Sequence, residues 1–321
     1  MNTMRKVTIT GAALAAALAF GGSGPATAQQ DLTIMTSVPS LGFPFFVHMM
    51  KELEAEATVL GHIDTNQSDG QNSTPKQTAD VETAIIQGVD GIVISPIEVD
   101  AMAPALQQAV DAGIPVVTID RRVEGVPGIL AHVGADNVKG GEAQGRFIME
   151  RFPDGATIVN LQGQPGASPA IDRNAGVHNV LDQHSVQYPF VAEQTAFFAR
   201  DKGLSVTESI LAGLDTPPDV IVAANDDMAL GALEAVSALG LRDQITIIGF
   251  DALPEALASV RDGGLAGTVE QFPGGQSRKA MQVLVGHLRE GVAPEQSVIL
   301  LTPIVIDAGN IGEAERLGEI N

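Results

Sequence analysis

Short apolar runs rich in β-branched residues alternate with helical patterns along most of this 321-residue chain. This alternation predicts parallel sheets covered by helices on both faces, the doubly wound α/β architecture. Strands are predicted at 32–38, 91–95, 115–119, 156–161, 191–195, 220–224, 245–250, 265–270 and 298–306. Helices are predicted at 45–60, 74–88, 103–112, 138–152, 169–184, 201–212, 228–239, 254–261 and 275–290. A less regular passage at 123–136 separates two α/β halves.

Three of the predicted strands end on polar side chains that can bind hydroxyl groups. Strand 115–119 is followed by Asp120 and Arg121, and the two later strands are followed by Asn225 and Asp251. In an open α/β sheet, ligands bind beyond the carboxyl ends of the strands. A solvated loop explains any one of these endings equally well, but their recurrence predicts a polar ligand site.

The first residues have the pattern of an export signal. Arg5 and Lys6 precede an apolar, alanine-rich stretch that is too short for a good membrane anchor, and a small-residue cleavage site follows. We therefore predict a signal peptide over residues 1–28, cleaved near Ala28 and Gln29, and export to the periplasm. The chain has no cysteine, which excludes a lipidated cysteine and a disulfide framework.

Composition and motifs exclude several classes of function. The net charge of −21 argues against nucleic acid, which requires a basic surface. Gly163 and Gly166 form only an isolated G-x-x-G, and the acidic segment 64–70 lacks the spacing of a calcium loop. The six histidines lack metal-ligand spacing, and no serine lies in a nucleophile-elbow pattern. We therefore expect no metal, no cofactor and no enzymatic activity.

Several longer motifs occur in a recognisable order. They are P-F-F-V at 44–47, T-I-D-R at 118–121, D-N-V-x-G-G at 136–141, N-D-x-M-A-L-G-A-L at 225–233, G-F-D at 249–251, and Gln271 followed by Pro273. With these motifs the chain resembles the periplasmic ribose-binding protein family, the type I sugar-binding proteins of ABC importers, from about Leu32 to Ile306. The resemblance implies two α/β lobes joined by a three-strand hinge that close over a sugar.

The resemblance also implies the domain boundaries. The first lobe would comprise residues 29–135 plus about 272–301, and the second lobe residues 136–271 plus about 302–321. The chain would cross between them near 135–136, at Gln271 and near 302–303. Helix 275–290 exceeds what the second α/β half needs, so we expect it to pack on the first lobe.

The family's sugar-binding residues carry over to nine positions of this chain. These are Phe45, Phe46, Asp120, Arg121, Arg173, Phe198, Asn225, Asp251 and Gln271. The residue types suit the ligand, because an ionised aspartate accepts hydrogen bonds from hydroxyls and an arginine donates two parallel ones. Phenyl rings would cover the apolar faces of the sugar ring.

Structural roles remain open for some of these residues. Asn225 and Asp251 are also placed to act as helix N-caps, and either phenylalanine of the 45–46 pair could belong to the core. Arg173 follows Asp172 directly, so the two could form an exposed ion pair.

Two positions depart from the ribose branch of the family. Phe43 stands where that branch has an asparagine, and Pro39 stands where a small polar residue is usual. Fewer polar groups and more apolar bulk in the first lobe predict that ribose is not the best ligand. A different pentose, a deoxy-sugar, a ketose or a short polyol should bind more tightly.

The leading hypothesis is a monomeric binding protein that delivers a monosaccharide or polyol to a membrane permease. Presentation of the bound sugar to a chemoreceptor or sensor kinase is compatible with it. An exported α/β enzyme is disfavoured by the missing phosphate loop. A sugar-sensing repressor is disfavoured because the leader stands where its DNA-binding helices would be.

Overall fold

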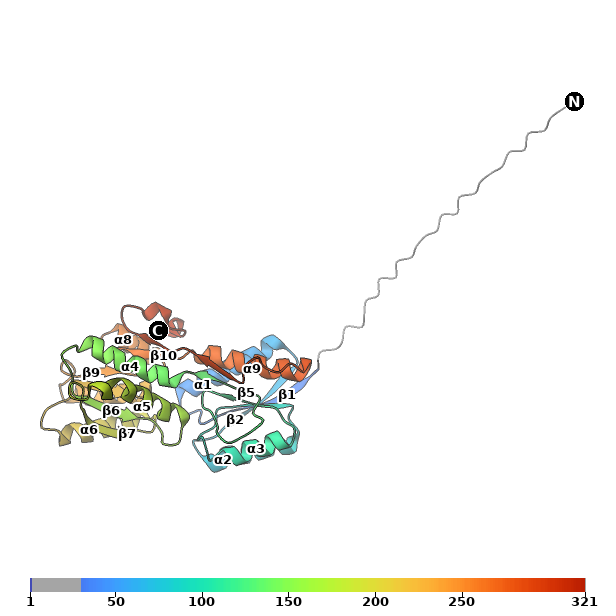
Figure 1. Cartoon of the computed structure of the whole chain (residues 1–321), viewed down its shortest axis with the longest axis horizontal. Coiled ribbons are helices and arrows are strands. Elements are labelled where there is room, and N and C mark those ends of the chain that lie inside the picture. Colours follow the sequence, from blue (N-terminus) through green and yellow to red (C-terminus); the bar gives the residue numbers. More distant parts are fainter. Residues whose placement is uncertain (2–29, 321) are drawn as a thin grey trace. The chain divides into compact units, whose positions relative to one another are not determined.

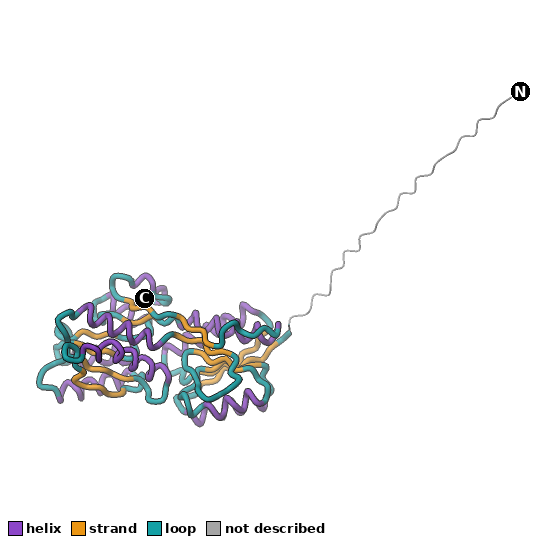
Figure 2. The backbone as a smooth tube through the Cα atoms, viewed as in Figure 1, coloured by secondary structure: helices purple, strands orange, loops and turns teal. Residues whose placement is uncertain are grey.

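The computed structural model describes Met1 and residues 30–320, so the predicted leader lies, apart from Met1, outside the described part of the chain. From residue 31 on, strands and helices alternate as the sequence predicts, and the doubly wound α/β fold class is confirmed (Figures 1 and 2). Within the described residues, no helix combines the length and the apolar character needed to cross a membrane.

The first sheet has six parallel strands in the order β11-β5-β4-β3-β1-β2. Its strands are β1 (Leu32–Val38), β2 (Ile63–Asp69), β3 (Gly91–Ile94), β4 (Val116–Ile119), β5 (Ala131–Ala135) and β11 (Val298–Leu301). Its helices are α1 (Pro44–Leu60), α2 (Thr74–Gln87), α3 (Ala103–Asp111) and α9 (Pro273–Glu290). We call this sheet and its helices the first lobe.

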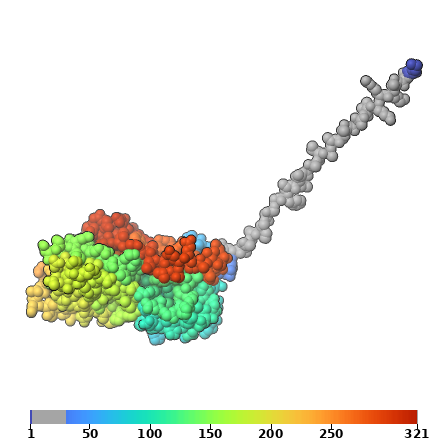
Figure 3. All heavy atoms as spheres, viewed as in Figure 1, coloured from blue at the N-terminus to red at the C-terminus, as the bar shows by residue number. Residues whose placement is uncertain are grey.

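Side chains of a strand alternate between the two faces of its sheet, and this alternation divides the first lobe into two cores. Along β3, Ile92 and Ile94 join the core that α2 and α3 cover, whereas Val93 joins the core that α1 and α9 cover. Helix α9 packs on α1 and over β3, β4 and β5. Figure 3 shows this late segment, in orange to red, lying against the blue-to-teal surface of the first lobe.

The second lobe repeats the same strand order. Strands β7 (Phe190–Thr195), β6 (Ile158–Gln162), β8 (Val220–Ala223) and β9 (Thr246–Ile248) are parallel neighbours in that order. A bridge between Ile248 and Gly267 continues this sheet to β10 (Thr268–Glu270), which pairs antiparallel with β12 (Ile304–Ile306). Its helices are α4 (Asn137–Arg151), α5 (Ser168–Leu181), α6 (Arg200–Gly213), α7 (Asp226–Ala238) and α8 (Pro254–Arg261).

Short 3₁₀ helices complete the second half of the chain. Helix η1 (Asp182–His184) continues α5, and η2 (Ile311–Glu313) and η3 (Leu317–Glu319) follow β12. The chain passes from one sheet to the other three times: between β5 and α4, between β10 and α9, and between β11 and β12.

Three elements differ from the sequence-based expectation. The passage at 123–136, expected to be less regular, contains the strand β5. The segment that we considered as a calcium loop is the edge strand β2, which pairs with β1 over its whole length. It has no apolar run, because many side chains of an edge strand face solvent and are not buried in the core. The single strand expected at 298–306 is two strands in different sheets, and β12 is antiparallel. Pro303 lies at the break between them, where a missing N–H does least harm.

Candidate ligand site between the two lobes

One cavity brings together all nine residues expected to bind a sugar. The space between its walls amounts to about 360 Å³, part of which is open to solvent. Its wall consists of Phe43, Phe45, Phe46, Asp120, Arg121, Pro169, Arg173, Phe198, Asn225, Asp227, Asp251 and Gln271. Five of the polar residues follow the carboxyl ends of β4, β8, β9 and β10, where a doubly wound sheet places its ligands. Arg173 and Asp227 lie instead on α5 and α7.

The first lobe contributes Asp120 and Arg121 directly after β4. Asp120 has a φ of 59°, so the chain turns sharply here, and its Oδ2 accepts a hydrogen bond from Ser95 Oγ at 3.1 Å. Arg121 donates through Nη1 to the carbonyl oxygen of Ile97 at 2.9 Å. Its buried Nε lies 3.9 Å from Asp120 Oδ2 and forms no hydrogen bond within the described residues.

Aromatic rings of both lobes surround Arg121. Its guanidinium carbon lies 5.3 Å from the ring centroid of Phe46 and 5.6 Å from that of Phe198. Both distances are within cation–π range. Phe45 and Phe46 meet edge to face at 5.2 Å, and both rings are buried, belong to the apolar core and line the cavity. Core packing and a place in the cavity wall were considered as alternatives for this pair, and both apply.

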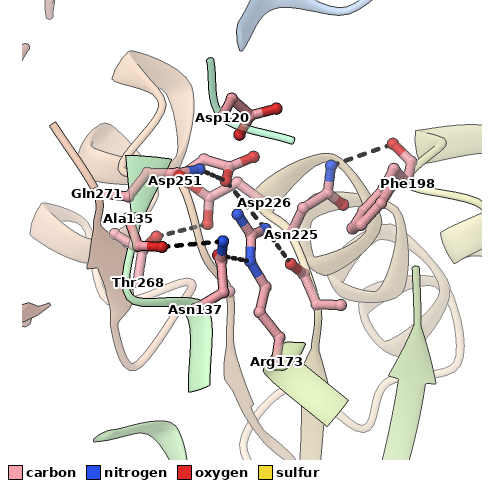
Figure 4. Close-up of polar contacts among 12 residues, drawn as sticks. Asp120, Ala135, Asn137, Arg173, Phe198, Asn225, Asp226, Asp251, Thr268 and Gln271 are labelled. Atoms are coloured by element: carbon pink, nitrogen blue, oxygen red, sulfur yellow. Dashed lines mark hydrogen bonds and ion pairs between the residues drawn. The ribbon is translucent and has the colours of Figure 1, made fainter. Parts of the chain in front are cut away.

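In the second lobe, Arg173 is the centre of the hydrogen-bond network (Figure 4). Its Nε donates to Asn137 Oδ1 at 2.9 Å and its Nη1 to the carbonyl oxygen of Ala224 at 2.7 Å. The same Nη1 lies 3.3 Å from Asp251 Oδ1. An exposed pair with Asp172 is therefore the wrong alternative, because Arg173 is buried and faces the cavity.

Asp251 and Asn225 differ in their structural role. Asp251 caps no helix; its Oδ1 accepts from Gln271 Nε2 at 2.5 Å, and its φ is 114°. Asn225 is the N-cap of α7, accepting from the Met228 N–H at 3.0 Å, and it also donates to the carbonyl oxygen of Phe198 at 3.1 Å. The cap interpretation is thus wrong for Asp251, and for Asn225 it holds together with a place in the cavity wall.

Burial shifts the pKa of each charged residue in the cavity toward its neutral form. It raises the pKa of Asp251 to about 7, against the opposing effect of Arg173, and it raises the pKa of Asp120. It lowers the pKa of Arg121 to about 10 and also lowers the pKa of Arg173. Hydroxyl groups of a ligand would hydrogen-bond the charged forms and offset this desolvation. The site therefore suits a neutral, polyhydroxylated molecule.

The structure adds two residues to the site and removes one. Asp227 and Pro169 line the cavity, although no sequence motif pointed to them. Phe43 lines it as expected, but Pro39 does not. Pro39 is buried, and its carbonyl oxygen accepts from the Asn72 N–H at 2.7 Å. Pro39 therefore does not support the specificity hypothesis through a direct contact with the ligand.

Outside the cavity the two lobes also contact each other directly. Arg122 forms a two-bond ion pair with Asp172, in which Nη2 lies 3.1 Å from Oδ1, and its backbone N–H donates to Ser168 Oγ at 3.0 Å. The N–H of Val99 donates to the carbonyl oxygen of Gly166 at 2.9 Å. These contacts join the first lobe to the start of α5 and hold the cavity closed on that side.

Comparison with known proteins shows the family to which this fold belongs. Residues 34–291 match the family model described as a periplasmic binding protein domain. The ribose import binding protein of Bacillus subtilis is 43% identical over 247 residues, which cover 76% of this chain and 78% of that protein. The chain therefore belongs to the periplasmic ribose-binding protein family.

Solved structures of this family are equally similar. The Caulobacter myo-inositol binding protein, bound to myo-inositol, has a TM-score of 0.87 and 42% identity, covering 90% of this chain and 98% of that one. A solute-binding protein of Bacillus halodurans with bound myo-inositol has a TM-score of 0.83 and 29% identity, covering 89% and 97%. Family, fold and cavity together define a substrate-binding protein of the class that serves ABC importers.

Proposed function

We propose that this protein binds a neutral cyclic polyol of the myo-inositol type in the periplasm and delivers it to the permease of an ABC importer. The observation that carries the choice of ligand is the presence of three carboxylates in the cavity wall: Asp120, Asp227 and Asp251. A fully hydroxylated ring has a donor to offer each of them.

Hydrogen-bond donors and acceptors distinguish a cyclic polyol from a sugar at this site. An ionised carboxylate only accepts hydrogen bonds, and the ring oxygen of a pyranose or furanose also only accepts. A ring oxygen that faces one of the three carboxylates would leave both atoms unpaired, at about 1–3 kcal/mol each. A cyclic polyol carries a hydroxyl on every ring carbon and avoids this conflict. Arg121 and Arg173 donate to the hydroxyl lone pairs, and Phe198 offers an apolar face.

The relatives are named either for ribose or for myo-inositol, and Phe43 supports a choice between these two ligands. The Bacillus subtilis relative is named for ribose, whereas the Caulobacter and Bacillus halodurans structures hold myo-inositol. Phe43 lines this cavity where the ribose branch has an amide. The loss of that amide favours a ligand other than ribose.

The remaining parts of the proposal concern the whole molecule. The predicted leader would direct export and be cleaved near Ala28 and Gln29. The mature protein would act as a monomer whose lobes, 29–135 plus about 272–301 and 136–271 plus about 302–321, close by bending at the three crossings. Presentation of the liganded form to a chemoreceptor is a compatible second use. The relatives are named as binding proteins, which supports binding over catalysis.

The contacts between the lobes should contribute to affinity. The Arg122–Asp172 pair forms only when the lobes touch, so it favours the binding-competent closed state. We expect Asp172→Asn to weaken binding about two- to tenfold, a range set by partly exposed bidentate pairs. Asp182→Asn, at an exposed acid just beyond α5, serves as the control in calorimetry. Equal affinities of both variants and the parent protein would show that the pair does not assist closure.

A thermal-shift panel tests the choice of ligand. It should contain myo-inositol, ribose, D-allose and xylitol, and an extrinsic dye is needed because the chain has no tryptophan. We expect myo-inositol to raise the melting temperature most, and Phe43→Asn to improve the rank of ribose. The largest shift with ribose, together with an unchanged ranking in Phe43→Asn, would reject the proposal.

A further inference from the structure

We propose that Asp227 contacts the ligand directly and determines specificity. Its carboxylate would accept a hydrogen bond from the ligand hydroxyl at the end of the cavity that Phe43 bounds. This inference rests on the proposed function, since it takes the ligand to be a polyol.

Asp227 and Phe43 line the same two pockets. One is the cavity, and the other is a neighbouring surface pocket formed with Gly42 and with Arg200 and Leu204 of α6. Phe43 comes from the first lobe, immediately before α1, and Asp227 comes from the first turn of α7 in the second lobe. A ligand between the lobes would therefore have Asp227 beside it at the position where Phe43 offers no polar group.

The carboxylate of Asp227 is uncommitted, in contrast to that of its neighbour. Both oxygens of Asp226 are occupied, Oδ1 by Thr268 Oγ1 at 2.7 Å and Oδ2 by the Leu253 N–H at 2.8 Å. Asp227 forms no hydrogen bond and no ion pair within the described part of the chain. Arg200, the cation that acts on it electrostatically, is already paired with Glu234 and Glu255, each at 2.7 Å.

Among the three carboxylates of the cavity wall, Asp227 has no arginine partner in that wall. Asp251 lies 3.3 Å from Arg173, and Asp120 lies 3.9 Å from Arg121. No third arginine lines the cavity. Burial raises the pKa of Asp227 to about 6, with Arg200 opposing the rise, as expected for a half-buried carboxylate that lacks a donor. A ligand hydroxyl is the donor that the cavity can bring to it.

A purely structural role of Asp227 at the start of α7 does not explain its place in the cavity wall. An acid in the first turn of a helix interacts favourably with the helix dipole, by about 0.3–1 kcal/mol at an exposed site. Asp226 already occupies the first turn of α7, and Asn225 caps it. Neither function requires Asp227 to line the cavity. The polar group that the first lobe lost at Phe43 is thus replaced by one from the second lobe.

The test is calorimetric titration of Asp227→Ala and Asp227→Asn with myo-inositol. Asp262→Asn is the control, because Asp262 is an exposed acid of the same lobe, at the end of α8, and lines neither the cavity nor the neighbouring pocket. We expect Asp227→Ala to bind about 10- to 100-fold more weakly, the loss of one charge-assisted hydrogen bond, and the control to bind within twofold of the parent protein.

A set of monodeoxy-inositols then identifies the contact. For the isomer that lacks the hydroxyl bound by Asp227, Asp227→Ala should change affinity less than threefold. A less than threefold effect on myo-inositol itself, or an equal loss for every isomer, would overturn the role of Asp227. If the parent protein binds ribose or D-allose but not myo-inositol, the proposed ligand is wrong and the same variants are measured with that sugar. If it binds none of them, both proposals fail.

Discussion

Replacing Asp251 with asparagine should weaken ligand binding about 30- to 1,000-fold while the protein stays folded, a loss of about 2–4 kcal/mol. The carboxylate is buried beside Arg173 and Gln271, so its charge strengthens each hydrogen bond that a ligand donates to it. Asparagine keeps the shape and tolerates the positive φ of 114°, which alanine does not. Titration calorimetry measures the loss, and far-ultraviolet circular dichroism verifies the fold.

The control for this experiment is Asp262→Asn. Asp262 lies in the same lobe at the end of α8, is exposed, and pairs only with its neighbour Arg261. Its removal should leave affinity unchanged. Near-native affinity of Asp251→Asn would show that Asp251 serves the arrangement of Arg173 and Gln271 and not the ligand.

A large loss of stability is expected from Gly231→Ala. Helices α6 and α7 approach closely at Gly203 and Gly231, and a Cβ at Gly231 would lie 2.1 Å from the carbonyl oxygen of Arg200 and 2.7 Å from the N–H of Leu204. Both are backbone atoms, so the helices must separate. Overpacking of this kind costs about 1–3 kcal/mol and occasionally more. Urea unfolding followed by circular dichroism should show the loss.

Gly286→Ala provides the matched comparison. Gly286 also lies within a helix, α9, but a Cβ there has no neighbouring atom within 4 Å. Because alanine favours helix over glycine by about 1 kcal/mol, this variant should be as stable as the parent protein or more so. Equal destabilisation by both substitutions would contradict the close-packing explanation.

The sequence predicted the site best where polar residues end buried strands. Asp120, Asn225 and Asp251 each follow an apolar run, and that pattern is local, so it can be read without the fold. Arg173 and Phe198 could not be found in this way. They lie at the start of α5 and just before α6, and only the family resemblance pointed to them.

The features that the sequence did not predict depend on tertiary contacts. Strand β2 has no apolar run of its own, and it forms because β1 offers a free edge. From the sequence Asp227 is an ordinary first-turn acid, and only the fold shows that it lines the same cavity as Phe43 of the first lobe. Pro39 was selected because it precedes Phe43 closely in the sequence, but it does not line the cavity.

The central claim is that the cavity between the lobes recognises a fully hydroxylated ring. Titration calorimetry of the mature protein, unfolded and refolded to remove any retained ligand, with myo-inositol and with ribose tests it most directly. The account predicts one site per chain and binding of myo-inositol at least about tenfold tighter than ribose, a difference of about 1.4 kcal/mol. Equal or tighter binding of ribose would contradict it.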